Sequence, residues 1–319
     1  MERKLAIGID IGGTNTKFGV VDATGNILWK GEMKTTGHAQ PNSYVEALRA
    51  TVIPGIEKCG GIKGFCGIGV GAPNGNYYSG CIEHAANLEW KGIVPIADMI
   101  SKAFQLPVQL TNDANAAAMG EMQYGAARGM KDFIVITLGT GVGSGIVANG
   151  KLVIGHDGFA GELGHTVIRP GGRFHPGTGL KGSLEMYCSA GGMVANAQEL
   201  LAIDPHSSML RDIPESELTS AMIFECAGKG DKIANDTFKY TGQLMGEAFA
   251  NFVMFSSPEA IILFGGITKA GELIRKPVVE SMEKHLLKVF QNKVKILFSE
   301  LDEADSAILG AAALVEEFQ

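Results

Sequence analysis

Apolar residues alternate with small and polar ones through residues 6–22, and the alternation stops once, at a pair of glycines, before it resumes. Alternation with a period of two is typical of half-buried strands, so this segment predicts two strands joined by a turn. Residues 133–155 repeat the pattern, and in both copies a second turn and a third strand follow. The second turn is Asp22 to Asn26 in the first copy and Asn149-Gly150, a dipeptide typical of two-residue hairpins, in the second. Four residues recur 126 positions later: Gly13, Thr14, Gly19 and Val21 as Gly139, Thr140, Gly145 and Val147. The sequence therefore predicts two related halves.

Helix and strand patterns follow each group of strands. Residues 42–59 place four apolar side chains on one helical face: Val45, Leu48, Val52 and Ile56. The other predicted elements are strands at 65–73, 107–113 and 260–267, helices at 95–104, 114–125, 231–257 and 272–290, and a strand followed by a helix within 295–318. Strands that alternate with helices in two related halves predict an α/β protein with a cleft between two lobes.

The first turn of each half carries groups that bind anions: Asp10, Gly12, Gly13 and Thr14 in the first, and Gly139, Thr140 and Gly141 in the second. Successive backbone N–H groups in glycine-rich turns form a nest for anions, and threonine adds a hydroxyl donor. The Asp10 carboxylate suits Mg²⁺, directly or through water. One such turn is a weak signal, because structural glycines give the same pattern. Two at matching places predict that the hairpins grip a chain of phosphates from both sides.

Asn112 and Asp113 come where a predicted strand ends and an alanine-rich helix begins. Active-site groups of open α/β folds gather at this position, so Asp113 is a candidate general base for a substrate hydroxyl, with Asn112 holding a neighbouring hydroxyl. The alternative role of the pair is to cap the helix, which Asn115 could share.

Glu162 and His165 form a third group, in residues 158–168. Gly161 and Gly164 favour a loop, and an acceptor presented beside a ring donor suits a polyhydroxylated ligand. The same E-x-x-H spacing can be half of a metal site, although the flanking histidine of H-E-x-x-H is missing. Glu185 follows a glycine-rich loop; taken alone, it is typical of a solvated surface acid.

The composition is that of a folded protein, with 45% apolar and 19% charged residues among 319. The net charge of −7 argues against nucleic acid as the main partner. No apolar signal region and no run long enough to cross a bilayer is found, so we expect a cytoplasmic protein that does not bind membranes. The five scattered cysteines contain no C-x-x-C pair, which indicates reduced thiols rather than disulfides or a zinc ribbon.

Together these segments resemble the ROK family of sugar kinases, repressors and related proteins. The resemblance spans nearly the whole chain and rests on GIDIGGTNTKFGVV, GVGAP, LTNDANAAAMGE, TLGTGVGSGIV, GELGH, GSLE and ILFGGI, in family order. It implies the two-lobed actin/hexokinase-type ATPase fold (ribonuclease H-like), ATP and Mg²⁺ in the cleft, and phosphoryl transfer to a hexose hydroxyl. Such transfer depends mainly on positioning and charge neutralisation.

The resemblance also implies roles for individual residues. Asp10 lies near the magnesium and the phosphates, and Asp113 is the general base. The two phosphate hairpins are Gly12, Gly13 and Thr14 with Gly139, Thr140 and Gly141, and Gly265 and Gly266 lie against the nucleoside. The residues implied to contact the sugar are Gly71, Asn87, Asn112, Asp113, Glu162, His165 and Glu185.

The chain departs from the family pattern at two places. Most ROK kinases follow the histidine of G-H-T with C-x-C-G-x-x-G-C, which binds a structural zinc together with that histidine. Here Pro176, Thr178 and Ser183 stand at the three cysteine positions, and neither proline nor neutral hydroxyls replace thiolates. We therefore expect no structural zinc, even with His175 close by, and expect His165 to be available to the sugar. The second departure is Asn74, where glycine is common, in the loop on the sugar side.

We expect an ATP-dependent hexokinase with glucose as the first candidate substrate, then N-acetylglucosamine or N-acetylmannosamine, with fructose and allose also open. Rival functions are a sugar-responsive repressor, a non-catalytic sugar-binding protein and an actin-like or chaperone ATPase. The predicted first strand begins within five residues of Met1, which leaves no room for a repressor's winged helix-turn-helix. The predicted lobes are residues 1–112 with 306–319, and residues 113–305, the latter mediating a homodimer.

Overall fold

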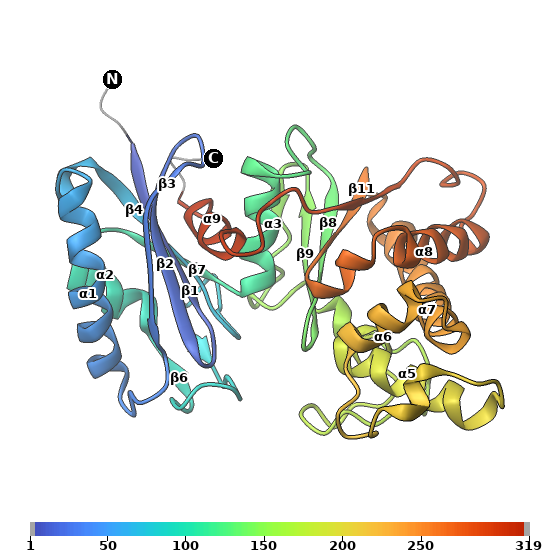
Figure 1. Ribbon diagram of the computed structural model, residues 1–319. Coiled ribbons are helices and arrows are strands. Elements are labelled where there is room, and N and C mark those ends of the chain that lie inside the picture. Colours follow the sequence, from blue (N-terminus) through green and yellow to red (C-terminus); the bar gives the residue numbers. More distant parts are fainter. Residues whose placement is uncertain (1–3, 316–319) are drawn as a thin grey trace. The chain divides into compact units, whose positions relative to one another are not determined.

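The computed structural model describes residues 4–315, and these form two compact units (Figure 1). The first unit comprises residues up to 130, residues 145–161 and residues from 299 onward. The second comprises residues 131–144 and 162–298. The lobe boundaries given above stay a prediction, and the parts of it that concern residues 1–3 and 316–319 lie outside the described residues.

The first five-stranded sheet has the order β3-β2-β1-β4-β7. Its first three strands pair antiparallel and the last two run parallel to β1. The elements of this part of the chain are β1 (Leu5–Ile11), β2 (Asn15–Asp22), β3 (Ile27–Lys34), α1 (Pro41–Lys58), the 3-10 turn Ile62–Gly64, β4 (Phe65–Gly71), β5 (Ile82–Glu83), β6 (Ile93–Val94), α2 (Ile96–Phe104), β7 (Val108–Thr111), α3 (Asp113–Tyr124) and α9 (Ser306–Ala312).

The second five-stranded sheet repeats this order as β10-β9-β8-β11-β12, with β11 parallel to β8 and β12. The elements of the later part are β8 (Phe133–Leu138), β9 (Val142–Ala148), β10 (Lys151–Leu152), the 3-10 turn Leu163–His165, α4 (Glu185–Cys188), α5 (Ala190–Ile203), the 3-10 turn Met209–Asp212, α6 (Ser220–Gly228), α7 (Lys232–Ser256), β11 (Ala260–Phe264), the 3-10 turn Gly266–Ala270, α8 (Glu272–His285) and β12 (Lys295–Phe298). The matching order of the two sheets confirms the predicted repeat.

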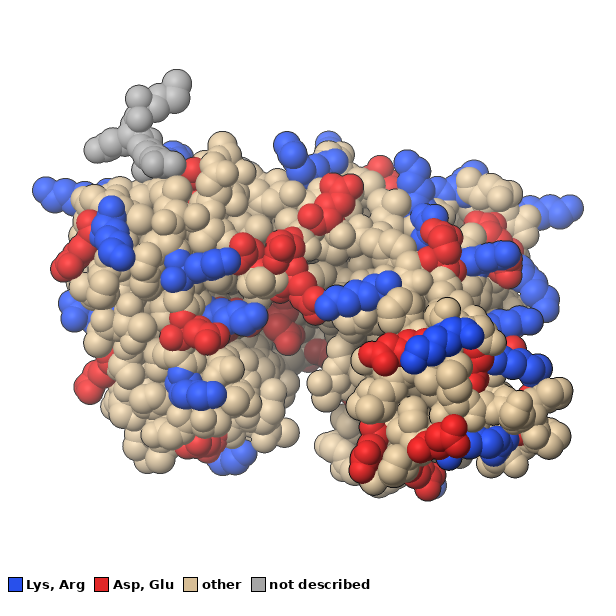
Figure 2. All heavy atoms as spheres, in the orientation of Figure 1, with Lys and Arg blue, Asp and Glu red and all other residues tan. Residues whose placement is uncertain are grey.

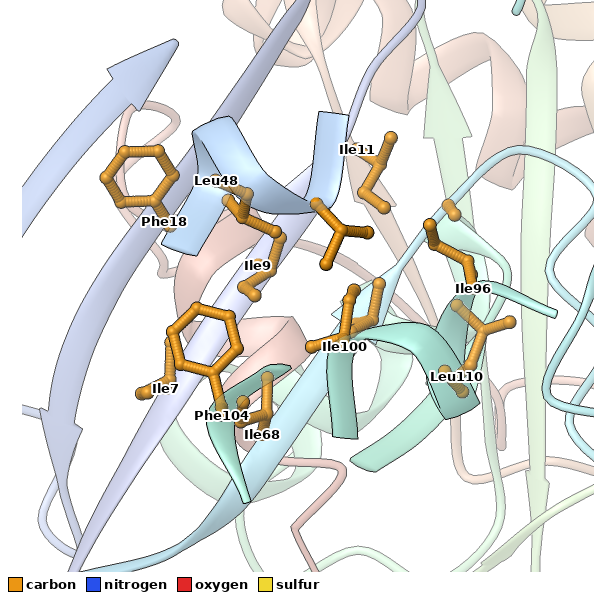
Figure 3. Close-up of a cluster of buried hydrophobic side chains, with 14 of the residues drawn as sticks. Ile7, Ile9, Ile11, Phe18, Leu48, Ile68, Ile96, Ile100, Phe104 and Leu110 are labelled. Atoms are coloured by element: carbon orange, nitrogen blue, oxygen red, sulfur yellow. The ribbon is translucent and has the colours of Figure 1, made fainter. Parts of the chain in front are cut away.

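Alternation along β1 separates the two faces of the first sheet. Ile7, Ile9 and Ile11 point to a core closed by α1 and α2, in which Leu48 and Ile100 are fully buried (Figure 3). The four apolar residues predicted for the face of α1 are all buried. Because side chains alternate along a strand, Asp10 projects to the opposite face.

The opposite face of the first sheet is packed tightly against α9 and α3. A methyl group built on Gly8 would lie 2.1 Å from the Ile308 carbonyl oxygen, and one on Gly69 1.7 Å from the Ala311 carbonyl oxygen. Only glycine therefore lets the α9 backbone approach β1 and β4 so closely. This packing fixes the face on which Asp10 lies.

The second unit departs from the sequence patterns in two ways. Helix α8 ends at His285, five residues before the predicted end, because Leu286 is extended. Leu287 and Val289 continue the helical period but are about 60% exposed, so no core holds them in a helix. Helices α5 and α6 lie in a segment for which the patterns predict no element.

On the face shown in Figure 2, Lys and Arg side chains are mixed with Asp and Glu over both units, and no continuous basic surface is visible. Among the described residues, no helix combines the length and the apolar composition needed to cross a bilayer. All five cysteines are free thiols.

Candidate active site

Three parallel strands bring the acidic residues of the first unit together. Asp10 on β1 pairs with Gly71 on β4, and Gly71 pairs with Thr111 on β7, so the three residues lie side by side at the carboxyl ends of their strands. A methyl group on Gly71 would lie 3.7 Å from both Asp10 Oδ1 and the Asp113 Cα. Gly71 therefore lies beside the Asp10 carboxylate and the backbone of Asp113, and a side chain there would also crowd Ala116, whose Cβ would be 3.3 Å from the methyl group.

The start of α3 gives Asn112 and Asp113 separate roles. Asn112 is the N-cap, and its Oδ1 accepts the Asn115 N–H at 2.7 Å, as the capping alternative predicts. Asn115 does not share this role: it is buried, and its Nδ2 donates to Thr111 Oγ1. Asp113 Oδ1 accepts the Ala114 N–H at 2.9 Å. The Asn112 amide nitrogen and the second Asp113 oxygen are the atoms this arrangement leaves for a substrate.

Burial raises the pKa of both acids, and the Asp113 charge adds to the rise at Asp10. Burial, then the Asp113 charge, raise the pKa of Asp10 to about 6, and Lys17 opposes the rise. Burial raises the pKa of Asp113, and the Ala114 N–H opposes this. Although the surrounding protein desolvates the Asp113 carboxylate, the residue as a whole is exposed at the surface. Hydration therefore moderates the rise in its pKa, and the carboxylate is accessible to a substrate. A cation beside Asp10 would relieve this repulsion.

The hairpin between β1 and β2 is closed by the Gly12 N–H, which donates to the Asn15 carbonyl. A methyl group on Gly13 would lie 2.8 Å from the Asn87 carbonyl oxygen. Neither glycine has a positive φ, so close contact rather than left-handed backbone requires them. The structure thus brings Asn87, predicted to contact the sugar, against the first hairpin predicted to bind phosphates. Thr14 is exposed there, and its carbonyl accepts the Thr35 N–H.

A buried hydroxyl network lies beneath this hairpin. Thr16 Oγ1 is 2.8 Å from both Thr35 Oγ1 and the Tyr44 hydroxyl, and the Tyr44 ring packs edge-on against Trp90. Burial raises the pKa of Tyr44, and the Asp10 charge adds to this. Neither Thr16 nor Tyr44 is predicted from the sequence to support the site. The only local signal is that Thr16, a polar residue, stands at an inward-facing position of β2. Nothing in that pattern indicates that its partner is Tyr44, 28 residues away.

The hairpin between β8 and β9 is tied to the helices that follow it. The Gly139 carbonyl accepts the Ala190 N–H at the start of α5, and the Gly139 N–H donates to the Gly141 carbonyl. Gly141 lies directly under Glu185, where a methyl group would be 2.4 Å from Oε2. Thr140 is exposed at the tip. None of the three has a positive φ.

Gly265 and Gly266 follow β11 beside the same hairpin. Gly265 has φ of 109°, and a methyl group on it would lie 2.4 Å from the Leu138 carbonyl oxygen. Both the left-handed backbone and the contact with the end of β8 require glycine there. Gly266 has open space around its Cα. The structure therefore brings the predicted nucleoside glycines next to the second hairpin predicted to bind phosphates.

His165 lies on the 3-10 turn Leu163–His165, and Glu162 is the N-cap residue that directly precedes this turn. His165 Nε2 is 3.9 Å from Glu162 Oε2. Within the described residues, His165 Nδ1 is buried without a hydrogen-bond partner. The turn packs on β9: the Leu163 N–H donates to Ser144 Oγ, and Gly164 lies against the Val142 carbonyl.

Glu185 is not the solvated surface acid that its local sequence suggests. Its side chain is 17% exposed, and its Oε2 accepts the Val142 N–H at 2.7 Å. Its Oε1 lies 2.5 Å from Nε2 of His175. The sequence shows His175 only as a poor metal ligand, because no local pattern reveals its pairing with Glu185, ten residues later.

Residues 166–184 form an irregular hairpin held by its own backbone. Thr166 and Leu184, Ile168 and Gly182, and His175 and Leu180 are joined by backbone hydrogen bonds. Arg173 anchors the hairpin further, by bonds to Glu199 and to the Met186 and Gly192 carbonyls and by stacking on Tyr187.

The residues at the three family cysteine positions do not fit a zinc ion. Pro176 and Thr178 are exposed at the tip of this hairpin, and Ser183 is buried opposite Val167. Proline offers no side-chain donor, and neutral hydroxyls are poor zinc ligands. Among residues 4–315, no group of three or more His, Cys, Asp or Glu is placed to hold a metal ion. The expected absence of a structural zinc stays a prediction.

Asn74 occupies a left-handed position, with φ of 51°. Its Nδ2 donates to the Glu83 carbonyl, and the Glu83 N–H donates to the Asn74 carbonyl. Asparagine tolerates this backbone better than other non-glycine residues, which explains how it stands where glycine is common.

A model of the ROK family matches residues 6–318. The chain belongs to the ROK family. It is 33% identical to a glucokinase of Halalkalibacterium halodurans, over 99% of this chain and 96% of that protein. It also matches the crystal structure of a ROK glucokinase from Streptomyces griseus in complex with glucose and AMPPNP, with a TM-score of 0.79 and 33% identity over 98% of this chain and 99% of that one.

The family also contains regulators. A xylose repressor of Caldicellulosiruptor bescii is 31% identical over 79% of this chain and 63% of its own length. The predicted α/β fold of the actin-like ATPase type is confirmed by the ROK sugar kinase structures that the chain matches. The full-length relatives named glucokinase support sugar kinase activity for this ROK protein.

Proposed function

We propose that this protein transfers the γ-phosphoryl group of ATP to a hexose hydroxyl, with glucose as the preferred sugar and glucose 6-phosphate as the product. The observation that carries the proposal is Asp113: an accessible carboxylate at the first turn of α3, held by the Ala114 N–H beside Asp10. A repressor or a passive sugar-binding protein has no need for a base at this point. Relatives of full length that are named glucokinase support the choice of glucose.

Asp113 acts as the general base in this proposal. Its Oδ1 is occupied by the Ala114 N–H, so the other oxygen accepts the proton of the sugar hydroxyl as that hydroxyl attacks the phosphorus. The raised pKa makes the carboxylate a stronger base near neutral pH. The Asn112 amide donates to a neighbouring sugar oxygen, because its own oxygen is used in the cap.

Asp10 is the residue that would hold Mg²⁺ together with ATP. Mg²⁺ commonly binds one or two carboxylates plus substrate phosphates and water, and the Asp10 carboxylate beside Gly71, on which the Asp113 charge acts, fits that donor set. When bound, the ion supplies neutralisation of phosphate charge. The N–H groups of the two glycine hairpins, Gly12 to Thr14 and Gly139 to Gly141, bind the phosphates, and Gly265 and Gly266 pack against the nucleoside.

Glu162, His165 and Glu185 hold sugar hydroxyls in the second unit, and Gly71 and Asn87 do so in the first. The same polar groups bind the hydroxyls shared by glucose, N-acetylglucosamine and N-acetylmannosamine, so these N-acetylhexosamines and fructose are alternative substrates. We further propose a homodimer in the cytoplasm, which analytical ultracentrifugation and cell fractionation test. A non-catalytic sugar sensor is the alternative from a different class, favoured by the similarity to a repressor.

The decisive experiment is sugar-dependent ADP release from Mg-ATP with glucose, N-acetylglucosamine, N-acetylmannosamine, mannose, fructose and allose, and with Asp113→Asn as the control. Release with one sugar that is lost in the variant supports both the reaction and its substrate. If no sugar promotes release while one of them raises the melting temperature, the protein is a sensor and the kinase proposal is wrong.

A further inference from the structure

His175 contacts two of the residues that we propose as sugar ligands. Its Nε2 lies 2.5 Å from Glu185 Oε1. Its ring also packs edge-on against the ring of His165, with 6.0 Å between the ring centroids. The His175 and Glu185 side chains are 19% and 17% exposed, so the pair is largely shielded from competing water.

The surroundings of His175 determine which nitrogen carries the proton. Nδ1 accepts two backbone N–H groups, from Gly177 at 3.1 Å and from Thr178 at 3.2 Å. A nitrogen that accepts hydrogen bonds carries no hydrogen, so the neutral ring is protonated at Nε2. Nε2 therefore donates to Glu185, and the tip of the hairpin sets the direction of that donation.

Both oxygens of Glu185 are held as a result. Oε1 accepts from His175, and Oε2 accepts the Val142 N–H at 2.7 Å. Val142 directly follows the glycine hairpin between β8 and β9, so the carboxylate joins that hairpin to His175 in the hairpin of residues 166–184. Two donors fix the plane of the carboxylate, and charge-assisted bonds of this kind are stronger than neutral ones.

We propose that His175 is a positioning residue for sugar binding: through Nε2–H it holds the Glu185 carboxylate in the orientation that receives a sugar hydroxyl. In this chain the family's zinc thiolates are replaced, and His175 together with the backbone hydrogen bonds of residues 166–184 holds the loop in place instead. The inference rests on the proposed role of Glu185 as a sugar ligand, and it adds a residue that the family pattern does not include.

Two substitutions distinguish the hydrogen-bonding roles of the two ring nitrogens of His175. His175→Asn places an amide oxygen near the position of Nδ1, which keeps an acceptor for Gly177 and Thr178 but removes the donor to Glu185. His175→Gln places an amide NH₂ near the position of Nε2, which restores the donor and removes the acceptor at the tip. His206→Gln is the surface control, because the His206 side chain is 64% exposed and contacts Asp204 through Nδ1 rather than Nε2.

The test measures glucose affinity by calorimetry without nucleotide, ADP affinity, and melting temperature for the wild type, these three variants and Glu185→Gln. We expect His175→Asn and Glu185→Gln to weaken glucose binding about tenfold, the loss of one hydrogen bond to a charged group. ADP affinity and melting temperature should change little in His175→Asn. His175→Gln should recover most of the glucose affinity at a lower melting temperature, and His206→Gln should match the wild type.

Wild-type glucose affinity in His175→Asn overturns the inference, and so does an equal loss in both His175 variants that follows their melting temperatures. Wild-type affinity in Glu185→Gln also overturns it, because Glu185 is then no sugar ligand. The kinase proposal fails separately: absence of sugar-dependent ADP release in the wild type rejects it, while the expected order of binding affinities still supports the role of His175.

Discussion

The carboxylate of Glu185 fills the space over Gly141, so that a methyl group on Gly141 would lie 2.4 Å from Oε2. The contact is with the end of a flexible side chain, not with backbone. Gly141→Ala should therefore fold, with the Glu185 carboxylate displaced from the Val142 N–H. We expect glucose affinity to fall about tenfold, as for loss of one charge-assisted bond, with a small drop in melting temperature.

The control for this substitution is Gly191→Ala, since a methyl group on Gly191 meets nothing within 4 Å. Calorimetry measures the glucose affinity of both variants. Unchanged affinity in Gly141→Ala would show that the position of Glu185 is not set by this contact.

Asp113→Asn should separate binding from turnover. Asparagine keeps the size of the side chain and an oxygen for the Ala114 N–H, so glucose should still raise the melting temperature. It removes the base, and we expect kcat to fall by about a hundredfold or more. Steady-state kinetics at saturating glucose check this, and a variant with more than a tenth of wild-type turnover would remove Asp113 from the role of base.

Much of the framework could be predicted because its signals are local. The strands of both hairpins alternate with a period of two, and the matching turns recur at one offset along the chain. Asn112 and Asp113 could be predicted because adjacent residues mark the boundary between the strand and the helix. The glycines of both turns and the face of α1 were readable for the same reason.

The rest depends on contacts between distant residues, which leave no periodic trace. Glu185 has the sequence context of a surface acid, and only the hairpin that brings His175 to it shows otherwise. Leu287 and Val289 extend the helical period of α8 past its end, because periodicity does not show whether a packing surface is present. The return of residues 145–161 to the first unit likewise rests on packing, of Gly145 against Ala118.

Asp10 should make stability depend on pH. Its carboxyl titrates near 3.8 when unfolded and at about 6 when folded, because of burial and Asp113. Between these values the folded chain binds more protons, so the free energy of unfolding falls as pH rises from about 4 to about 6 and then levels off.

Asp10→Asn removes the buried carboxylate whose ionisation lowers the free energy of unfolding. The variant should be more stable than the wild type near pH 7.5, by at most about 3 kcal/mol, and equal to it below about pH 4. Urea unfolding across this range without Mg²⁺ or nucleotide measures the difference. Asp98→Asn, at an exposed residue paired with Lys102, is the control. A variant that is less stable than the wild type at neutral pH would contradict the assigned cause.

Zinc chelation should leave the protein intact. Pro176, Thr178 and Ser183 provide no thiolate, and backbone bonds with Arg173 hold the hairpin instead. We expect melting temperature and sugar-dependent ADP release to be unchanged after dialysis against a zinc-selective chelator, with no stoichiometric zinc by elemental analysis. Release of one zinc per chain together with unfolding would overturn the prediction.

A positive control follows from the same three positions. Pro176→Cys, Thr178→Cys and Ser183→Cys together supply three thiolates on the hairpin that follows His165, whose buried Nδ1 has no hydrogen-bond partner among the described residues. Three thiolates and one imidazole are a tetrahedral zinc set. The triple variant should bind one zinc and become sensitive to chelator, and adding His165→Asn should weaken that binding. A triple variant that binds no zinc would show that the hairpin, not only its ligand types, has departed from the family's metal site.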